Sequence, residues 1–256
     1  MPRIAATRYI EPLREGGSLP ALVEADDDGL YVLKLRGAGQ GPRALVAELI
    51  AGEVARAAGV RVPELALVDL DVDLTRAEPD PEIQDLLRAS VGLNLGLDYL
   101  PGSLAYDPAA RQPVDPGLAA EVVWLDALLT NVDRTAKNPN LLVWHGNLWL
   151  IDHGAALFRH HNDWRMEGAE RPFPAIATHV LLPVAASVTE ADARLAPRLR
   201  PDVIRRIAGM LPDAFLEDEE GVTPDERREA YAAHLVARLE GCRDFAREAE
   251  DARRGA

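Results

Sequence analysis

The sequence predicts an α+β fold of two lobes, a small antiparallel β lobe at residues 1–97 and a larger α-helical lobe at residues 103–256. Short strand-like runs alternate with tight turns near the start, whereas apolar residues at helical spacing dominate later in the chain. A Pro–Gly break separates the two patterns, so residues 98–102 are the predicted hinge. With 256 residues, 48% of them hydrophobic, the chain can bury a sizeable core.

The β lobe is expected to open with a three-stranded meander. Its predicted strands are residues 3–13, 21–25 and 30–35. Gly16 and Gly17 lie in the turn between the first two strands. Because side chains alternate along a strand, Lys34 shares a face with Val32, opposite Leu33. Lys34 is therefore expected to face a specific partner outside the meander.

A helix is predicted next. It begins at Pro42, since proline suits a first helical turn, and ends at Gly59. Glu48 and Glu53 lie on it. The rest of this lobe is predicted as a strand at 62–72, a short helix or excursion at 81–90, and a strand at 91–103.

The second lobe is expected to be mainly helical. Asp115 is a predicted N-cap with Pro116 as the first helical residue, and apolar residues follow at helical spacing. A β-hairpin is predicted at 141–151, where two apolar runs flank "HGN". Further helices are expected at 189–199, at 201–211 and after Thr223, whose "TPDE" has the form of a capping box.

Composition limits the classes of function. The formal charge of −14, from 28 basic and 42 acidic residues, makes nonspecific attraction to nucleic acid or anionic lipid unfavourable. The single cysteine, Cys242, excludes an internal disulfide and a zinc finger. No signal-peptide pattern and no apolar run of about 20 residues is present. We expect a cytoplasmic protein with no direct nucleic-acid partner and no membrane association.

The polar stretch "NVDRTAKNPNLL" directly precedes the predicted hairpin. Because a hairpin returns the chain to its starting point, Asp152 is expected to lie near Asp133 and Asn138. Two carboxylates and an amide oxygen suit hard oxygen coordination of magnesium together with nucleotide phosphates. In phosphoryl-transfer enzymes, an Asp accepts the hydroxyl proton, an Asn five residues later holds metal, and a further Asp beyond a hairpin holds metal. Asp133, Asn138 and Asp152 have this spacing.

The upstream residues follow in a matching order. Apart from Lys34 and Lys137, every basic residue is arginine, which makes a lysine on the third strand notable. A compact ammonium suits a point contact to nucleotide phosphates. Glu48 is the expected partner of Lys34, with Glu53 as the alternative. The segment "LDYLP" stands where a hinge would hydrogen-bond adenine, which selects the residues Asp98, Tyr99 and Leu100.

These residues resemble the HipA-like kinase family, particularly its short stand-alone members. The likeness spans most of the chain. It rests on "YVLKLRGAGQGPRALVAELIAGEVARAAGVRVPELALV", on "GLNLGLDYLPGSLAYDP" and, most specifically, on "WLDALLTNVDRTAKNPNLLVWHGNLWLIDHGAALF". The resemblance implies a bilobal protein-kinase-like fold and an ATP- and magnesium-dependent serine/threonine kinase. It implies Asp133 as catalytic base, Asn138 and Asp152 on metal, and Lys34 on phosphates.

The chain departs from the eukaryotic kinase pattern in three places. Asn-Val-Asp replaces His-Arg-Asp, Asp152-His153-Gly154 replaces Asp-Phe-Gly, and the glycine turn lacks a three-glycine pattern. These departures put regulation through an activation segment in doubt. Ser18 lies in the glycine turn, where toxin-type relatives carry a regulatory autophosphorylation site. The toxins also phosphorylate a glutamyl-tRNA synthetase and pair with a DNA-binding antitoxin, but nothing in this sequence indicates either partner.

Other interpretations start from the same residues. "RGAGQGPRAL" has the strand, glycine and helix order of a dinucleotide-binding turn, although Pro42 takes the place of its third glycine. A metal-hydrolase site could be drawn from Asp152, His153, His160, His161 and Asp163. Lys137 either supports a phosphate or is simply exposed.

The prediction is a kinase that uses ATP and Mg²⁺ to phosphorylate a hydroxyl acceptor, with protein serine or threonine as the leading acceptor. A small-molecule kinase of the same fold is the nearest alternative. The alternative from another class is a catalytically silent nucleotide-binding scaffold, against which the presence of Lys34, Asp133, Asn138 and Asp152 argues. The sequence leaves the acceptor, the oligomeric state and the role of the C-terminal helices open.

Overall fold

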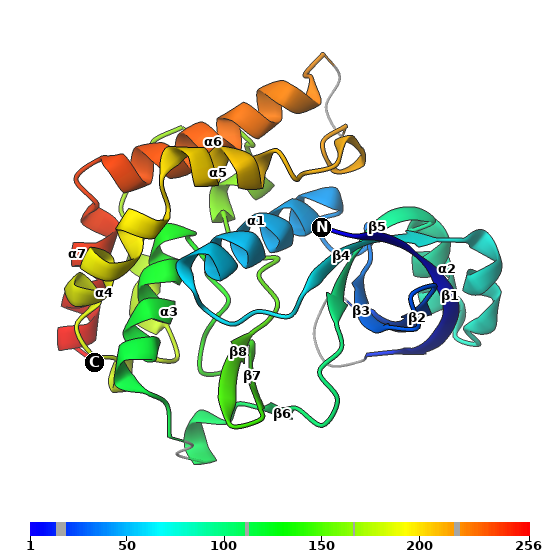
Figure 1. Ribbon diagram of the computed structural model, residues 1–256, viewed down its shortest axis with the longest axis horizontal. Helices are drawn as coiled ribbons and strands as arrows, with labels where there is room; N and C mark the ends of the chain where they lie inside the picture. Colours follow the sequence, from blue (N-terminus) through cyan, green and yellow to red (C-terminus); the bar gives the residue numbers. More distant parts are fainter. Residues whose placement is uncertain (14–18, 111–112, 166, 218–220) are drawn as a thin grey trace.

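The computed structural model describes residues 1–13, 19–110, 113–165, 167–217 and 221–256. A small β-barrel forms one end of the molecule, and most of the helices, together with a short hairpin, form the rest (Figure 1). Helix α1 lies between them. The α+β fold expected from the sequence is present.

The barrel consists of five strands in the closed order β1-β2-β3-β5-β4. They are β1 (Arg3–Pro12), β2 (Ala21–Ala25), β3 (Leu30–Lys34), β4 (Leu65–Leu70) and β5 (Gly92–Asp98). The pairs β1–β2, β2–β3, β3–β5 and β4–β5 are antiparallel, whereas β1 and β4 pair in parallel. The parallel pair differs from the purely antiparallel lobe that was expected. It arises because α1 carries the chain across the barrel before β4 begins, so β4 can run alongside β1 in the same direction.

The inside of the barrel is apolar, as the alternation along β3 predicts. Leu33, Val23 and Val68 are fully buried in it. Leu87 of helix α2 (Pro81–Ala89) belongs to the same cluster. Val32 packs instead against the other apolar cluster, outside the barrel. Lys34, on the same face as Val32, is thereby directed toward the rest of the molecule.

Helix α1 (Pro42–Ala58) connects the barrel to the helical part. It starts with proline and ends at Gly59 in a left-handed conformation, as predicted. Most of its side chains are buried, including that of Glu48. Leu49 of α1 shares one apolar cluster with Leu95 of β5 and Trp124 of α3 (Pro116–Leu128). The larger core therefore continues from the outer face of the barrel into the helices.

The remaining elements are mostly helical. The strands are β6 (Leu104–Ala105), β7 (Leu141–Trp144) and β8 (Asn147–Leu150), and the helices are α4 (Val188–Leu195), α5 (Pro201–Ala208), α6 (Pro224–Glu240) and α7 (Asp244–Arg254). The 3₁₀ turns are η1 (Val72–Ala77), η2 (Pro108–Ala110), η3 (Phe158–His161), η4 (Pro174–Thr178), η5 (Leu182–Val184), η6 (Ala196–Arg198) and η7 (Asp213–Phe215).

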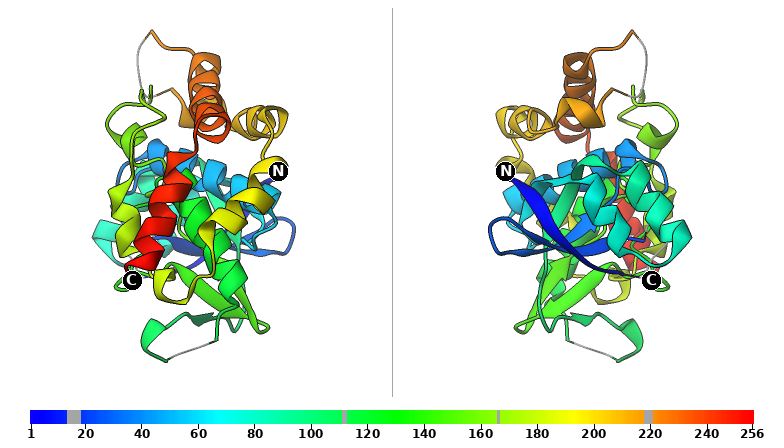
Figure 2. Two further views of the ribbon diagram at one scale, coloured as in Figure 1. Left: turned by 90° about the vertical axis from the view of Figure 1, so that its left-hand side faces the viewer. Right: turned by 90° about the vertical axis from the view of Figure 1, so that its right-hand side faces the viewer.

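Both predicted helix caps are present. The Asp115 carboxylate accepts from the Leu118 N–H at 2.8 Å, and Thr223 forms a capping box with Glu226. The helical segment after Thr223 divides at Gly241 into α6 and α7. Figure 2 shows α6, in orange, at one end of the molecule and the green β7–β8 hairpin toward the opposite end.

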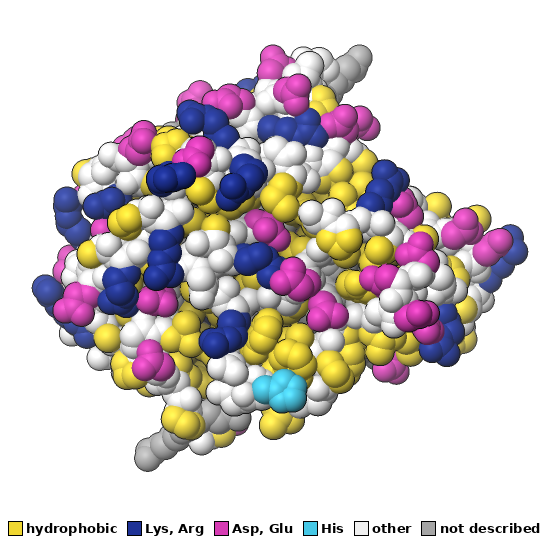
Figure 3. Space-filling view, viewed as in Figure 1, with side chains coloured by type: hydrophobic (Ala, Val, Ile, Leu, Met, Phe, Trp, Pro, Cys, Tyr) yellow, Lys and Arg dark blue, Asp and Glu magenta, His cyan; other side chains and the backbone are white. Residues whose placement is uncertain are grey.

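Acidic and basic side chains are interspersed over the face seen in Figure 3 rather than gathered into one basic patch. A search of the described residues finds no helix with the length and apolar character needed to cross a membrane.

Candidate active site

The β7–β8 hairpin brings the two ends of the polar stretch together. Leu141 pairs with Leu150, and the Ile151 N–H donates to the Asn140 carbonyl at 3.1 Å. The turn residues His145 and Gly146 both have positive φ, the backbone that a two-residue hairpin requires. The base of the hairpin consequently lies beside the loop that contains Asp133.

Asp133, Asn138 and Asp152 line one recess of about 260 Å³, together with Lys34 and Glu48. The structure thus gathers the residues that the sequence selected. Within the recess, Oδ2 of Asp133 accepts from the side-chain amides of Asn138 at 2.7 Å and Asn140 at 3.2 Å. Since both amides hold Oδ2, the other carboxylate oxygen is left to accept a proton. Asn138 uses its nitrogen for this bond, which leaves its amide oxygen for a cation.

Lys34 stands between two carboxylates. Its Nζ lies 2.6 Å from Oδ1 of Asp152 and 3.9 Å from Oε2 of Glu48. Burial disfavours the ammonium, but Glu48, Asp152 and Asp133 outweigh it and raise the pKa of Lys34. Glu48, rather than Glu53, is the partner on α1, because Glu53 pairs with Arg56. Lys34 is therefore a fixed positive charge at the edge of the recess.

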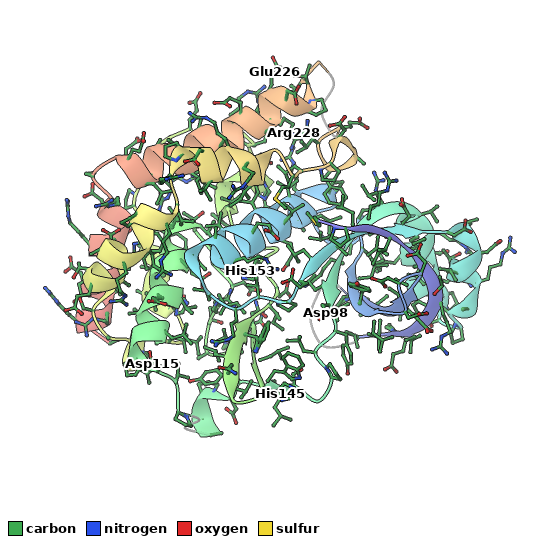
Figure 4. All side chains as sticks on the ribbon, viewed as in Figure 1. Asp98, Asp115, His145, His153, Glu226 and Arg228 are labelled. Atoms are coloured by element: carbon green, nitrogen blue, oxygen red, sulfur yellow. The ribbon has the colours of Figure 1, made fainter. Side chains whose placement is uncertain are left out.

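Glu48 joins α1 to the segment after the hairpin. Its carboxylate accepts from the His153 N–H at 2.8 Å and lies 3.2 Å from Nδ1 of the same residue. Burial opposes the charge of Glu48, but Lys34 and His153 outweigh burial and lower the pKa of Glu48 to about 2. His153 lies beside α1 in Figure 4, while Asp98 lies where the barrel meets the rest of the molecule. Glu48 therefore fixes both Lys34 and the backbone next to Asp152.

A second, larger cleft adjoins the recess. It measures about 840 Å³ and shares Lys34 and Asp152 with the recess. Asp98, Tyr99 and Leu100, the residues of the predicted hinge, line it. The Asp98 and Tyr99 N–H groups donate to Glu64 and Leu30 carbonyls at 2.8 and 2.9 Å. In the described part of the chain the buried Leu100 N–H has no such acceptor, so it remains available to a bound ligand.

The sequence did not reveal a buried network beneath the recess. Asp126 of α3 is fully buried and accepts from Arg134 Nε at 2.5 Å, His179 Nε2 at 2.9 Å and Asn131 Nδ2 at 3.0 Å. Arg134 in turn donates to the carbonyls of Asn140 and Ile151, the residues that flank the hairpin. This network anchors the loop on both sides of Asp133 and next to Asp152.

A signal for this network was present in the sequence. Asp126 lies four positions after the apolar residue Val122 in the predicted helix. The two side chains therefore share a face, and the carboxylate is expected on the buried side of the helix. A carboxylate there needs a cationic partner. Arg134, in the loop that follows, is the nearest arginine along the chain.

The other predicted site residues are placed as follows. Gly16, Gly17 and Ser18 lie outside the described residues. Lys137 is exposed and pairs with no carboxylate in the described ranges.

The histidines of the alternative metal site have other partners. His153 bonds Glu48, and His160 bonds the Tyr231 hydroxyl at 3.0 Å. A metal-hydrolase site is not supported, since the described residues contain no group of three or more His, Cys, Asp or Glu side chains suited to a metal. The barrel also lacks the βαβ units of a dinucleotide fold.

Comparison of the fold with solved structures finds kinases at low sequence identity. A Helicobacter pylori proinflammatory kinase, CtkA, matches with a TM-score of 0.59 and 13% identity, covering 100% of this chain and 99% of that one. A Golgi casein kinase with Mn/ADP bound matches with a TM-score of 0.53 and 10% identity, covering 97% and 73%. These likenesses show that the fold is protein-kinase-like.

The sequence comparisons are more specific. No curated protein matches the chain. The family model described as HipA-like kinase matches residues 7–225, which include both clefts, the hinge, the loop at Asp133 and the hairpin. Because that match spans most of the chain and the same residues build the site, the protein is a phosphotransferase that belongs to the HipA-like kinase family.

Proposed function

We propose that the protein transfers the γ-phosphoryl group of ATP, with Mg²⁺, to a hydroxyl acceptor, and that this acceptor is a protein serine or threonine side chain, in keeping with its family. One observation carries the proposal. Lys34, Asp133, Asn138 and Asp152 line a single recess that opens beside a cleft of about 840 Å³. This arrangement offers a cation, a base and two metal-binding oxygens at one end of a nucleotide-sized cavity.

The cleft suits the adenine ring of the nucleotide. Val32 of the barrel and Leu142 of the hairpin both line it, and Leu100 lies at the predicted hinge. The Leu100 N–H would donate to a ring nitrogen of adenine, since the neighbouring Asp98 and Tyr99 N–H groups already have acceptors. This orientation directs the phosphates toward Lys34.

The side-chain oxygens of the recess suit a divalent ion such as Mg²⁺. Asn138, through its free amide oxygen, and Asp152 would hold it. When bound, such an ion offsets the negative charge of the nucleotide phosphates. A kinase of the same fold has Mn/ADP bound, which supports a nucleotide and a divalent metal in this site.

The transfer uses the remaining groups of the recess. Lys34 would contact the phosphates, held in place by Glu48. The acceptor hydroxyl oxygen forms a bond to the γ-phosphorus while the bond from that phosphorus to the bridging oxygen of ADP breaks. The hydroxyl proton passes to Asp133, whose Oδ2 is fixed by Asn138 and Asn140. The products are ADP and a phosphate monoester.

The test measures phosphate transfer from γ-labelled ATP with magnesium, using the purified full chain. Asp133→Asn should lower the rate by roughly 10²–10⁴-fold with ATP affinity retained, as expected for loss of a general base. Asp152→Asn should weaken magnesium-dependent ATP binding as well as transfer. Asp251→Asn, an exposed carboxylate on α7, is the matched control and should be unchanged.

The choice of acceptors distinguishes the alternatives. Label in protein, in the chain itself or in an added protein, supports a serine or threonine kinase. Label in small alcohols alone assigns a small-molecule kinase. A wild-type protein that binds ATP and magnesium but labels no protein, small alcohol or water would contradict the proposal and leave a silent scaffold.

A further inference from the structure

A third cavity adjoins the loop that contains Asp133. It measures about 300 Å³ and is lined by Thr130, Val132, Arg159, Arg171, His234 and Arg238, among others. We call it the arginine pocket. Val132 directly precedes Asp133, so the arginine pocket adjoins the loop that carries the proposed base. Neither the family nor the proposed transfer assigns it a role.

Three arginines converge on the arginine pocket from separate segments. Arg159 comes from η3, Arg171 from the loop before η4, and Arg238 from α6. Arg238 is buried and donates to the carbonyls of Ala127, Leu128 and Ala169 at 2.7–2.9 Å. Those carbonyls carry no formal charge, and the negative charge of Glu248 acts on Arg238 without forming an ion pair with it in the described residues.

Arg159 and Arg171 are not ion-paired in the described ranges, although the negative charge of Glu170 acts on Arg159. Among the residues that the structure describes, neither guanidinium forms an ion pair or a side-chain hydrogen bond. Nη1 of Arg159 is buried without any acceptor. A buried donor without a partner costs about 1–3 kcal/mol, and more when the group is charged. The arginine pocket therefore contains one buried donor, Nη1 of Arg159, that a ligand would satisfy, beside the exposed Arg171.

The three charges also repel one another. Burial lowers the pKa of Arg238 to about 10, and the charge of Arg159 adds to this effect. Burial likewise lowers the pKa of Arg159, with the charge of Arg171 as the next cause. The charges of Glu170 and Glu248 offset part of this effect, but the pKa values of Arg159 and Arg238 both stay below their ordinary value. An anion bound among them would relieve the repulsion.

The backbone is shaped to hold Arg171 there. Gly168 has a φ of +83°, and a Cβ at that position would lie 2.4 Å from Nε of Arg171. With glycine at position 168, the side chain of Arg171 can lie directly against the backbone. A larger residue there would require Arg171 to move.

We propose that the arginine pocket binds a phosphate group. A phosphate monoester carries about −1.5 to −2 charges and three acceptor oxygens, which matches several unpaired guanidinium donors better than a carboxylate does. At about 300 Å³ the pocket is far smaller than the nucleotide cleft of about 840 Å³, so it fits a phosphorylated side chain or free phosphate rather than a nucleotide. The inference is independent of the proposed transfer, because it concerns binding alone.

The experiment is calorimetric titration of the full chain at low ionic strength. The probes are a short peptide with one phosphoserine, the same peptide with serine, the same peptide with glutamate, and inorganic phosphate. The phosphopeptide should bind, and Arg159→Gln and Arg171→Gln should each weaken its affinity by about tenfold or more. Arg206→Gln, which removes an exposed arginine on α5, is the matched control and should change the affinity by less than about twofold.

The probes separate the sources of phosphate. Binding of the phosphopeptide well above inorganic phosphate assigns a phosphorylated side chain, whereas equal or tighter binding of inorganic phosphate assigns the free ion. Saturating ATP with magnesium should leave the binding intact, because the nucleotide cleft is separate.

Three results would overturn the proposal. One is equal binding of the serine or glutamate peptide, and another is displacement of the phosphopeptide by ATP. The third is an affinity that neither arginine variant alters, with thermal melting confirming that both variants are folded. Lack of phosphoryl transfer in the separate kinase assay would not affect this conclusion.

Discussion

Asp126 illustrates how single residues position the site. Its carboxylate lies among Arg134, His179 and Asn131 with no exposure to solvent. Nδ1 of His179 accepts from the Leu181 N–H at 3.1 Å, so the ring proton lies on Nε2, which donates to Asp126. Burial lowers the pKa of His179, which keeps the ring neutral. Arg134 is then the single cation that balances Asp126.

These ionisations make stability depend on pH. Burial opposes the charge of Asp126, but Arg134 and His179 outweigh it and hold the pKa of that carboxyl well below its usual range. In the unfolded chain Asp126 takes up a proton near its ordinary pKa of 3.8, while the folded form resists. Its stabilising contribution is therefore present above that pH and is lost as the pH falls. A neutral, buried His179 adds a loss in the same direction below its ordinary pKa of 6.5.

We predict that the free energy of unfolding of the wild type falls between pH 7 and pH 3, as measured by urea denaturation. Asp126→Asn should cost about 3–5 kcal/mol at pH 7, because it leaves Arg134 buried without a counter-charge. It should also flatten the pH dependence below pH 5. A variant with the same steep acid loss as the wild type would show that Asp126 does not contribute to it.

At the scale of elements, Gly59 and Arg198 fix the C-terminal end of α1. Gly59 terminates α1 with a φ of 91°, and Nη1 of Arg198 donates to the Ala58 carbonyl at 2.5 Å. A Cβ on Gly59 would lie 2.8 Å from that nitrogen. A side chain at this position would therefore strain the backbone and displace the arginine that caps the helix.

Gly59→Ala is predicted to destabilise the protein by about 1–2 kcal/mol, the combined cost of a left-handed alanine and a weakened cap. Denaturant titration measures it. Gly209→Ala, at the end of α5, is the matched control, because Gly209 has a φ of −65° that alanine readily adopts. We expect that control to be neutral or slightly stabilising. Equal losses in the two variants would contradict the role given to the conformation at Gly59.

At the scale of the whole molecule, the main core does not stop at the hinge. Leu95 on the outside of the barrel, Leu49 of α1 and Trp124 of α3 belong to one apolar cluster. Arg43 at the start of α1 also donates to the carbonyls of His160 and His161, at 3.2 and 3.0 Å, in the helical part. The predicted hinge at 98–102 therefore joins parts that share buried surface.

We predict that the barrel and the helical part unfold together. All four tryptophans lie beyond residue 102, so their fluorescence reports the helical part, while far-UV circular dichroism reports both parts. Urea transitions followed by the two signals should have the same midpoint and slope. An earlier transition in circular dichroism than in fluorescence would show that the barrel unfolds separately.

The sequence by itself determined what depends on local chemistry. Strand alternation placed Lys34 outside the barrel, proline and glycine bounded α1, and "HGN" produced the hairpin that returns Asp152 to Asp133. Each follows from interactions within a few residues or across one tight turn.

Only the tertiary structure decided contacts between segments distant in the chain. These are the parallel closure of β1 on β4, the Asp126–Arg134–His179 network, the Glu48 bonds to His153 and the convergence of the arginine pocket. The physical reason is that periodicity shows that a side chain is buried but does not identify its partner. For a buried charge the partner depends on which elements pack together, and that packing is a property of the whole molecule.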